Sequence, residues 1–286
     1  MTQASRNQRA NGSAPARRSR LDRVIARSPI WLTQLALLGT FLLAWQYLPQ
    51  VPALKAMGHL FDPYFVSSPV RVSRELYNLA TGSENSPVIW GYIWSTVYAS
   101  LLGTAIGMVL GAAFGLVMSN FRFVSEVMRP FVIGMNAVPR IALVPIVVIV
   151  FGPTPVSCVI ISVMVVFFVA FFNAYEGGTS VRDELVQNAR LLGANNWRIL
   201  TAIRLPYVMA WTLACLPLAV TFAIITVVTA EILTGVPGMG SLLGTAAVTG
   251  NSALTFAVVI TLAVVGITIT LAADFIRARV LHWWGK

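Results

Sequence analysis

The chain has 286 residues, of which 57% are hydrophobic and only 10% are charged. Soluble domains average about 25% charged residues, so these few charges could not cover a soluble surface, and a soluble globular domain is excluded. The net charge is +10, but the basic residues lie between long apolar runs, which indicates membrane topology rather than nucleic-acid binding. We therefore expect an all-α, polytopic membrane protein in contact with lipid.

The N-terminal 29 residues carry seven arginines and a single acid, Asp22, among small and polar residues. This composition predicts a disordered basic tail over residues 1–29. The apolar run that starts at Trp31 is too long for a signal-peptide core, and no small-residue cleavage site follows it, so it is interpreted as a membrane span. Residues 30–286 are predicted to form one transmembrane domain.

Six apolar runs have roughly the 20 residues that cross about 30 Å of hydrocarbon. They cover about residues 30–48, 90–118, 127–151, 155–174, 206–232 and 253–273. Between the first two, the pattern of Pro69–Thr81 predicts an amphipathic helix outside the bilayer. Most Lys and Arg residues fall in the tail and in alternate gaps. The positive-inside rule therefore predicts that both termini and the loop 175–206 are cytoplasmic.

The second run carries a glycine at every fourth position, namely Gly103, Gly107, Gly111 and Gly115. Residues at this spacing share one face of a helix. Small side chains let helices approach closely in lipid, where apolar burial offers little driving force. We expect a helix-packing face, and a sliding contact is the functional alternative.

The third run is interrupted by Pro130, Pro139 and Pro145. Breaks of this kind persist in membranes only where neighbouring protein or a water-filled path satisfies the freed backbone groups. Arg140 follows one break, and a cation inside an apolar run costs at least about 2.5 kcal/mol. Pro139, Arg140 and Pro145 are therefore candidates for a translocation pathway or gate, with Arg140 attracting anions. The alternatives are a kinked structural helix and an Arg140 side chain that reaches lipid phosphate.

Glu231 is the acid at the end of the fifth run, and a Gly-rich segment, residues 233–251, follows it. We expect Glu231 near the outer end of the span, where it is hydrated, caps the following loop or pairs with Arg140 at similar depth. It joins the pathway candidates for this reason. The moderately apolar segment predicts a re-entrant or surface helix under the outer mouth.

The loop 175–206 is polar, and its pattern predicts two short helices that meet at a glycine. Apolar residues recur at helical spacing within residues 181–192, opposite charged residues. Asn195 is placed to cap a second helix, Asn196 to Ile203, which is expected to end at Leu205-Pro206. A compact cytoplasmic knob of this kind suits docking of a protein partner.

This loop reads Gln187-Asn188-Ala189, then Gly193 after three residues, and Ile203-Arg204-Leu205-Pro206 after nine more. Its spacing resembles the motif of ATP-binding-cassette (ABC) importer permeases: E-A-A, three residues, G, nine residues, I-x-L-P. In that family the motif inserts a coupling helix into a groove on each ATPase. The resemblance implies that Gln187, Ala189, Gly193, Ile203, Leu205 and Pro206 couple to an ATPase. Gln187 and Asn188 depart from the usual Glu and Ala, which removes the charge that the Glu brings.

Two further segments, Val138–Pro145 with Phe151-Gly152 and Ala230–Ile232 with Gly238-Met239-Gly240, look like permeases of nitrate, sulfonate, taurine and bicarbonate importers. Altogether the resemblance covers about residues 65–275. It implies a type I ABC permease fold in the bacterial cytoplasmic (inner) membrane. The implied partners are a second identical chain, two ABC ATPase subunits and a periplasmic or lipid-anchored substrate-binding protein. The implied cargo is a small anion, and similar permeases import aromatic carboxylates or thiamine pyrimidine precursors.

The sequence contains no G-x-x-x-x-G-K-[ST] phosphate loop and no nucleophile constellation. ATP and Mg are therefore expected on the partner ATPase, with no cofactor or metal on this chain and no enzymatic activity of its own. Two other classes stay open. One is an ion-coupled secondary transporter with Arg140 or Glu231 as the coupling charge, against which no inverted repeat is evident. The other is a membrane anchor for a cytoplasmic partner.

Overall fold

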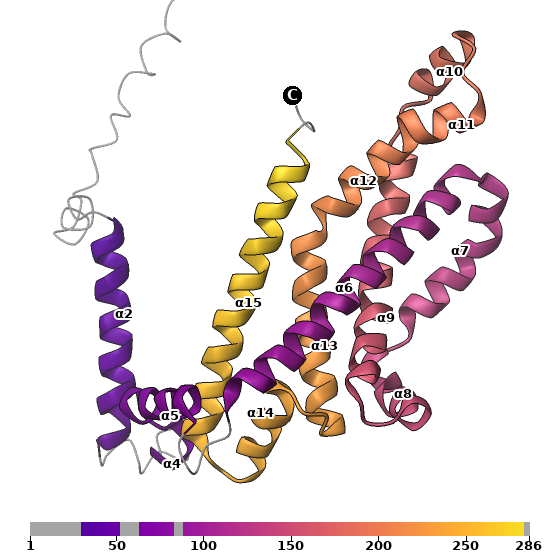
Figure 1. Cartoon of the computed structure of the whole chain (residues 1–286). Coiled ribbons are helices and arrows are strands. Elements are labelled where there is room, and N and C mark those ends of the chain that lie inside the picture. Colours follow the sequence, from indigo (N-terminus) through magenta and orange to yellow (C-terminus); the bar gives the residue numbers. More distant parts are fainter. Residues whose placement is uncertain (1–29, 52–62, 83–87, 283–286) are drawn as a thin grey trace, which may run out of the picture. The chain divides into compact units, whose positions relative to one another are not determined.

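The computed structural model describes residues 30–51, 63–82 and 88–282, so the predicted tail 1–29 lies outside the described residues. Every regular element in these ranges is helical (Figure 1), which confirms the all-α prediction. Five of the helices are long and apolar enough to cross a membrane, and a bent helix pair brings the number to six if it counts as one span. The chain divides into two units, Met1–Pro69 and Val70–Lys286, and each is described by itself.

The first unit is built on α2, Ile30–Tyr47, which is apolar on all sides and buries none of its residues within the protein. Its 18 residues span about 27 Å at 1.5 Å per residue, close to the thickness of the hydrocarbon core. A short 3₁₀ turn, η1 (Leu48–Gln50), ends the helix. The indole Nε1 of Trp45 donates to the carbonyl of Val66, at 3.0 Å, and so ties α2 to the short helix α4, Pro63–Val66.

Helix α5 has the predicted bounds, Pro69–Thr81. Proline suits the first turn of a helix because the backbone N–H that it lacks has no partner there. Val72 and Leu79 are buried whereas Arg71 and Arg74 are exposed, so the helix is amphipathic as predicted.

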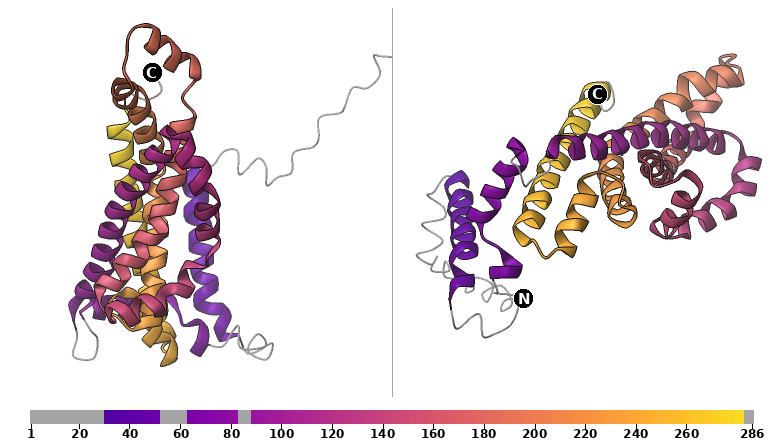
Figure 2. Two further views of the ribbon diagram at one scale, coloured as in Figure 1. Left: turned by 90° about the vertical axis from the view of Figure 1, so that its right-hand side faces the viewer. Right: turned by 60° about the horizontal axis from the view of Figure 1, so that its bottom comes forward.

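The second unit is centred on two adjacent helices, α6 (Ile89–Asn120) and α9 (Pro155–Thr179), which Figure 2 shows crossing in close contact. Both correspond to predicted spans and extend a few residues beyond them. Helix α9 also contacts α8, α12 and α13. Helix α9 therefore packs against four other helices of this unit, whereas α15 packs against α13 and α14.

Four of the five glycines of α6 lie against α9 with no room for a side chain. A Cβ atom built on Gly103 would lie 2.3 Å from the Ser162 hydroxyl oxygen, and one on Gly107 would lie 2.8 Å from Cβ of Val166. At Gly111 the nearest atom is the Phe167 carbonyl oxygen at 2.5 Å, and at Gly115 it is Cβ of Ala174 at 2.6 Å. The backbones of the two helices approach as closely as small residues permit.

The third run is sharply bent. It forms α7 (Arg122–Ala137), a 3₁₀ turn η3 (Arg140–Leu143) and α8 (Val144–Phe151), and the two halves are bent by 81°. The break lies at Pro139, because proline pushes the preceding residue, Val138, into an extended conformation. The predicted break is confirmed. The helix begins at Arg122, a few residues before the predicted start at about residue 127.

The other two prolines of this run leave the helices intact. Pro130 lies inside α7, and Pro145 lies in the first turn of α8, where no N–H is needed. The fifth run, predicted as one span over 206–232, is instead two helices, α12 (Leu205–Ala214) and α13 (Leu216–Thr234). They separate at Cys215 because Pro217 cannot donate to the Leu213 carbonyl four residues earlier.

A short helix, α14 (Met239–Val248), occupies the Gly-rich segment, and the last helix, α15, runs from Ser252 to Val280. The side-chain oxygen of Asn251 starts α15 by accepting from the Leu254 amide at 3.1 Å.

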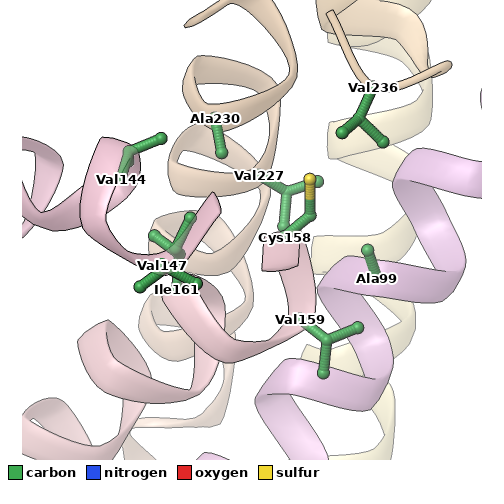
Figure 3. Packing of buried hydrophobic residues seen from close by; sticks show 9 residues of the cluster. All are labelled: Ala99, Val144, Val147, Cys158, Val159, Ile161, Val227, Ala230 and Val236. Atoms are coloured by element: carbon green, nitrogen blue, oxygen red, sulfur yellow. The ribbon is translucent and has the colours of Figure 1, made fainter. Parts of the chain in front are cut away.

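Figure 3 shows the apolar cluster that packs α8 against its neighbours. Nine buried residues come from α6, α8, α9, α13 and the α13–α14 connection: Ala99, Val144, Val147, Cys158, Val159, Ile161, Val227, Ala230 and Val236. Val144 and Val147 of α8 are therefore packed against α9 and α13. One face of α8 is thus covered by protein, whereas Ile146, Ile149 and Val150 are exposed on the other.

Candidate functional site

The predicted knob is present as two short helices, α10 (Asp183–Leu191) and α11 (Asn196–Ile199). In Figures 1 and 2 it projects from one end of the second unit, where α15 also ends, whereas α8 and α14 lie at the opposite end. Asp183 and Glu184 in the first turn of α10 and Arg190 in the last complement the helix dipole. Local charge thus stabilises a helix too short to be stable alone.

Gly193 ends α10 in a Schellman motif. Its φ angle is +82°, a left-handed conformation that only glycine adopts without strain. The Gly193 amide donates to the Arg190 carbonyl at 2.9 Å, and the Ala194 amide donates to the Ala189 carbonyl at 2.9 Å. The glycine of the motif is therefore the residue that turns α10 towards α11.

Asn195 caps α11 as predicted, since its side-chain oxygen accepts from the Arg198 amide at 2.8 Å. The predicted helix end at Leu205-Pro206 is wrong. Helix α11 continues through a π-helical turn, η4 (Leu200–Arg204), directly into α12. Pro206 is accommodated because it falls in the first turn of α12. The knob is thus joined by continuous helix to α12, the first part of the fifth apolar run.

The tip of the knob exposes large apolar side chains. Leu191, Leu192 and Trp197 are 86%, 89% and 71% exposed. A hollow of about 290 Å³ lies beside them, lined by Ala189, Leu192, Ala194, Arg198, Ile199, Ala202 and Ile203. Gln187 is exposed on α10, whereas Ile203, Leu205 and Pro206 are half-buried at the base. The motif therefore has an exposed tip and a packed base.

Arg140 lies at the bend of the broken run. Its Nη2 donates to the side-chain oxygen of Asn136 and, at 3.4 Å, to the Asn136 carbonyl. Its Cζ atom lies 4.7 Å from the centre of the Phe168 ring, within cation–π range. No ion pair of Arg140 with a carboxylate occurs among the described residues. The guanidinium thus has one amide and one aromatic ring as neighbours and keeps donors for a further acceptor.

Glu231 is 1% exposed, so it is not hydrated, and it does not pair with Arg140. The Thr96 hydroxyl of α6 lies 2.9 Å from each carboxylate oxygen, and the Gly240 amide donates to Oε2 at 2.8 Å. Thr96 Oγ1 also accepts from the Met239 amide at 2.9 Å. The carboxylate therefore lies at the N-terminus of α14, where the helix dipole favours an anion. The predicted capping role is the one that the structure bears out.

Two glycines of the same segment make room for this carboxylate. A Cβ atom on Gly238 would lie 2.1 Å from Oε1 of Glu231, and one on Gly240 would lie 2.2 Å from the Val228 carbonyl oxygen. The spacing of Gly238, Met239 and Gly240 thus reflects close approach of the α14 backbone to α13. Glu231, Thr96 and this turn join three helices into one cluster.

Sequence reasoning missed several residues that these contacts require. Thr96 lies 135 residues from its hydrogen-bond partner Glu231. Arg204 donates a hydrogen bond to Asn120, at the end of α6, which lies 84 residues away in the sequence. No local pattern pairs positions this far apart. The only available signal was the presence of isolated polar residues at the ends of apolar runs. No group of three or more potential metal ligands occurs in the described part of the chain.

Comparison with known proteins places this architecture in one family. Residues 86–283 match the family model described as "Binding-protein-dependent transport system inner membrane component". The riboflavin transport system permease protein RibX of Chloroflexus aurantiacus is 24% identical over 223 residues, which are 78% of this chain and 82% of the relative. The taurine transport system permease protein TauC of Escherichia coli is 22% identical over 229 residues, 79% of this chain and 83% of the relative.

The fold has a solved counterpart as well. A chain of the inward-facing MetNI methionine ABC transporter superposes with a TM-score of 0.59 at 15% sequence identity, covering 67% of this chain and 95% of that chain. The likeness is one of fold. The family match covers well over half of the chain. The chain therefore belongs to the binding-protein-dependent inner membrane components, and it is the multi-pass permease subunit of a type I ABC importer.

Proposed function

We propose that the knob formed by α10 and α11 is the surface on which an ABC ATPase docks. The observation that carries this proposal is the exposed apolar tip, Leu191, Leu192 and Trp197, beside a hollow at the end of the second unit where α15 also ends. Apolar side chains this exposed outside a membrane favour a protein partner. The spacing of Ala189, Gly193 and the I-x-L-P segment supports the same partner by its resemblance to the permease motif.

One chain carries one knob, so the complete importer requires two permease chains and two ATPase subunits. We infer a homodimer with the pathway along its two-fold axis. ATP and Mg bind to the ATPases, and a substrate-binding protein delivers cargo at the opposite end, near α8 and α14 (Figure 1). The knob end, where α15 also ends, is inferred to face the cytoplasm, and the positive-inside rule predicts the same side for the N-terminus.

In this mechanism the permease performs no covalent chemistry. Closure of the ATPases around ATP draws the two knobs together, and the continuous helix from α11 into α12 carries the movement into the spans. The pathway then opens outward to accept cargo, and nucleotide release reverses the change. Directionality comes from the different affinities of the two states for cargo and binding protein.

The cargo is inferred to be a small anion, nitrate-, sulfonate- or taurine-like. Arg140 supports this class because its guanidinium lies at a helix break with no carboxylate partner among the described residues. The relatives are named for riboflavin and taurine, so they do not agree on one chemistry. An aromatic carboxylate or a thiamine pyrimidine precursor is the second candidate. Glu231 gives no support to an ion-coupled transporter, since its carboxylate is bonded to Thr96 and α14.

Replacement of Gly193 tests the docking surface. An alanine at φ +82° is strained by about 1–2 kcal/mol, although no atom lies within 4 Å of the added methyl. Gly193→Ala should therefore weaken ATPase binding in proteoliposomes and lower the ATP hydrolysis that ligand-loaded binding protein stimulates. A panel of nitrate, taurine, benzoate and a thiamine pyrimidine, measured as uptake, identifies the cargo.

Gly250→Ala is the matched control. Gly250 has a φ angle of +67° and ends α14 with the same bond pattern, at the opposite end of the unit. It should carry the same strain and keep the wild-type ATPase affinity. Equal loss in both variants would refute docking at the knob, and full uptake without any ATPase would refute the ABC mechanism.

A further inference from the structure

Arg204 joins the base of the knob to the end of a different helix. It is the last residue of η4 and occupies the open position of I-x-L-P. Its Nη1 donates to the Ser119 carbonyl at 3.0 Å and to Oδ1 of Asn120 at 2.8 Å. Ser119 and Asn120 are the last two residues of α6. One side chain thus bridges two segments that are 84 residues apart.

This contact is strong for two physical reasons. The last carbonyls of a helix have no partner within it, and they form the negative end of the helix dipole. A guanidinium supplies both a donor and a positive charge at that position. Hydrogen bonds with one charged partner are roughly twice as strong as neutral ones. Arg204 is half-buried, so water competes less for these bonds than at an exposed site.

The π-helical turn aims Arg204 at α6. A π turn contains one residue more than an α turn, which offsets the helix faces on its two sides by about 100°. In η4 this offset falls between the knob and α12. The segment therefore presents Ala202 and Ile203 to the hollow beside the tip while Arg204 reaches the end of α6.

The end of α6 has no freedom to move separately from its neighbours. A Cβ atom on Gly178 of α9 would lie 2.0 Å from the Ser119 hydroxyl oxygen and 3.3 Å from Val208 of α12. Three helices thus meet around Ser119 without intervening space. Further along, α6 is packed on α9 through Gly103, Gly107, Gly111 and Gly115. A shift of η4 that pulls on Ser119 and Asn120 is passed to both helices.

We propose that Arg204 is a positioning residue that transmits movement of the docked knob to α6. This role rests on the proposed docking function. In this role Arg204 contacts neither cargo nor nucleotide. Without the guanidinium the tip of the knob still docks, because the exposed side chains at the tip are unchanged. The movement then reaches α12 through continuous helix but is no longer passed directly to α6.

The test uses the complete importer in proteoliposomes, with ATPase affinity and cargo uptake per ATP hydrolysed measured separately. Arg204→Ala should leave ATPase affinity within about twofold of wild type and lower uptake per ATP roughly tenfold, the scale of a lost charged hydrogen bond. Arg204→Lys keeps the charge but not the planar fork, and it should restore part of the ratio. Arg129→Ala is the control, because Arg129 is an exposed arginine of α7 and should leave both quantities unchanged.

Asn120→Ala removes one acceptor and provides a milder variant if Arg204→Ala assembles poorly. Because both variants break the same contact, the double variant should lose little more than Arg204→Ala alone. Loss of ATPase affinity in Arg204→Ala, as in Gly193→Ala, would overturn the proposal by making Arg204 part of the docking surface. An unchanged uptake per ATP would overturn it as well. A wild-type complex without ATP-driven uptake would refute the proposed function, and the role of Arg204 would fall with it.

Discussion

Gly111 offers the most direct test of the close packing between α6 and α9. A methyl group at this position would lie 2.5 Å from the Phe167 carbonyl oxygen and 2.8 Å from the Phe171 amide nitrogen. Both are backbone atoms of a helix, so neither can rotate away, and the helices must separate. Overpacking of this kind costs about 1–3 kcal/mol. Gly111→Ala is therefore expected to destabilise the second unit despite the better helix propensity of alanine.

Gly91→Ala isolates the packing term. Gly91 lies in the same helix, and no atom lies within 4 Å of its added methyl. Both substitutions bring the same propensity gain, about 1 kcal/mol. Their difference in unfolding free energy should then equal the overpacking cost, about 1–3 kcal/mol. Loss of helical circular dichroism during titration of mixed micelles with a denaturing detergent measures this difference. Equal stability of the two variants would refute the packing argument.

Three further outcomes follow from the buried carboxylate and the helix break. Glu231→Ala leaves the buried Gly240 amide without this acceptor, at about 1–3 kcal/mol, while the Thr96 hydroxyl keeps the Tyr92 carbonyl at 3.2 Å. The variant should speed amide hydrogen exchange in α14. Gly238→Ala should also speed exchange in α14, because its methyl would lie 2.1 Å from the Glu231 carboxylate. Gly244→Ala should not, because the nearest atom to its methyl lies at 3.7 Å. Equal exchange rates in the Gly238→Ala and Gly244→Ala variants would contradict the close-approach argument. Arg140→Ala should lower uptake of an anionic cargo about tenfold. Arg140→Lys keeps the charge and should lower uptake less. Equal uptake by the Arg140→Ala and Arg140→Lys variants would exclude a role for the charge.

The sequence alone determined the features that depend on local composition and pattern. Twenty-residue apolar runs leave a chain little choice but to span a membrane, because unpaired backbone groups are too costly in lipid. The bounds of α5 followed from its amphipathic pattern, and the Asn195 cap followed from a bond to a residue three positions away. The turn at Gly193 belongs here too, since its bonds lie within six residues.

The tertiary structure decided which of several locally equivalent groups matter. Three prolines interrupt the third run, yet only Pro139 breaks it, because Pro145 falls in a first turn and Pro130 is tolerated inside α7. The sequence makes Glu231 a pathway candidate but does not predict its partners, Thr96 and the α14 backbone. Arg204 looked like any basic residue of a cytoplasmic loop. Hydrogen bonds between segments 84 to 135 residues apart leave no trace in local spacing, and only packing brings their partners together.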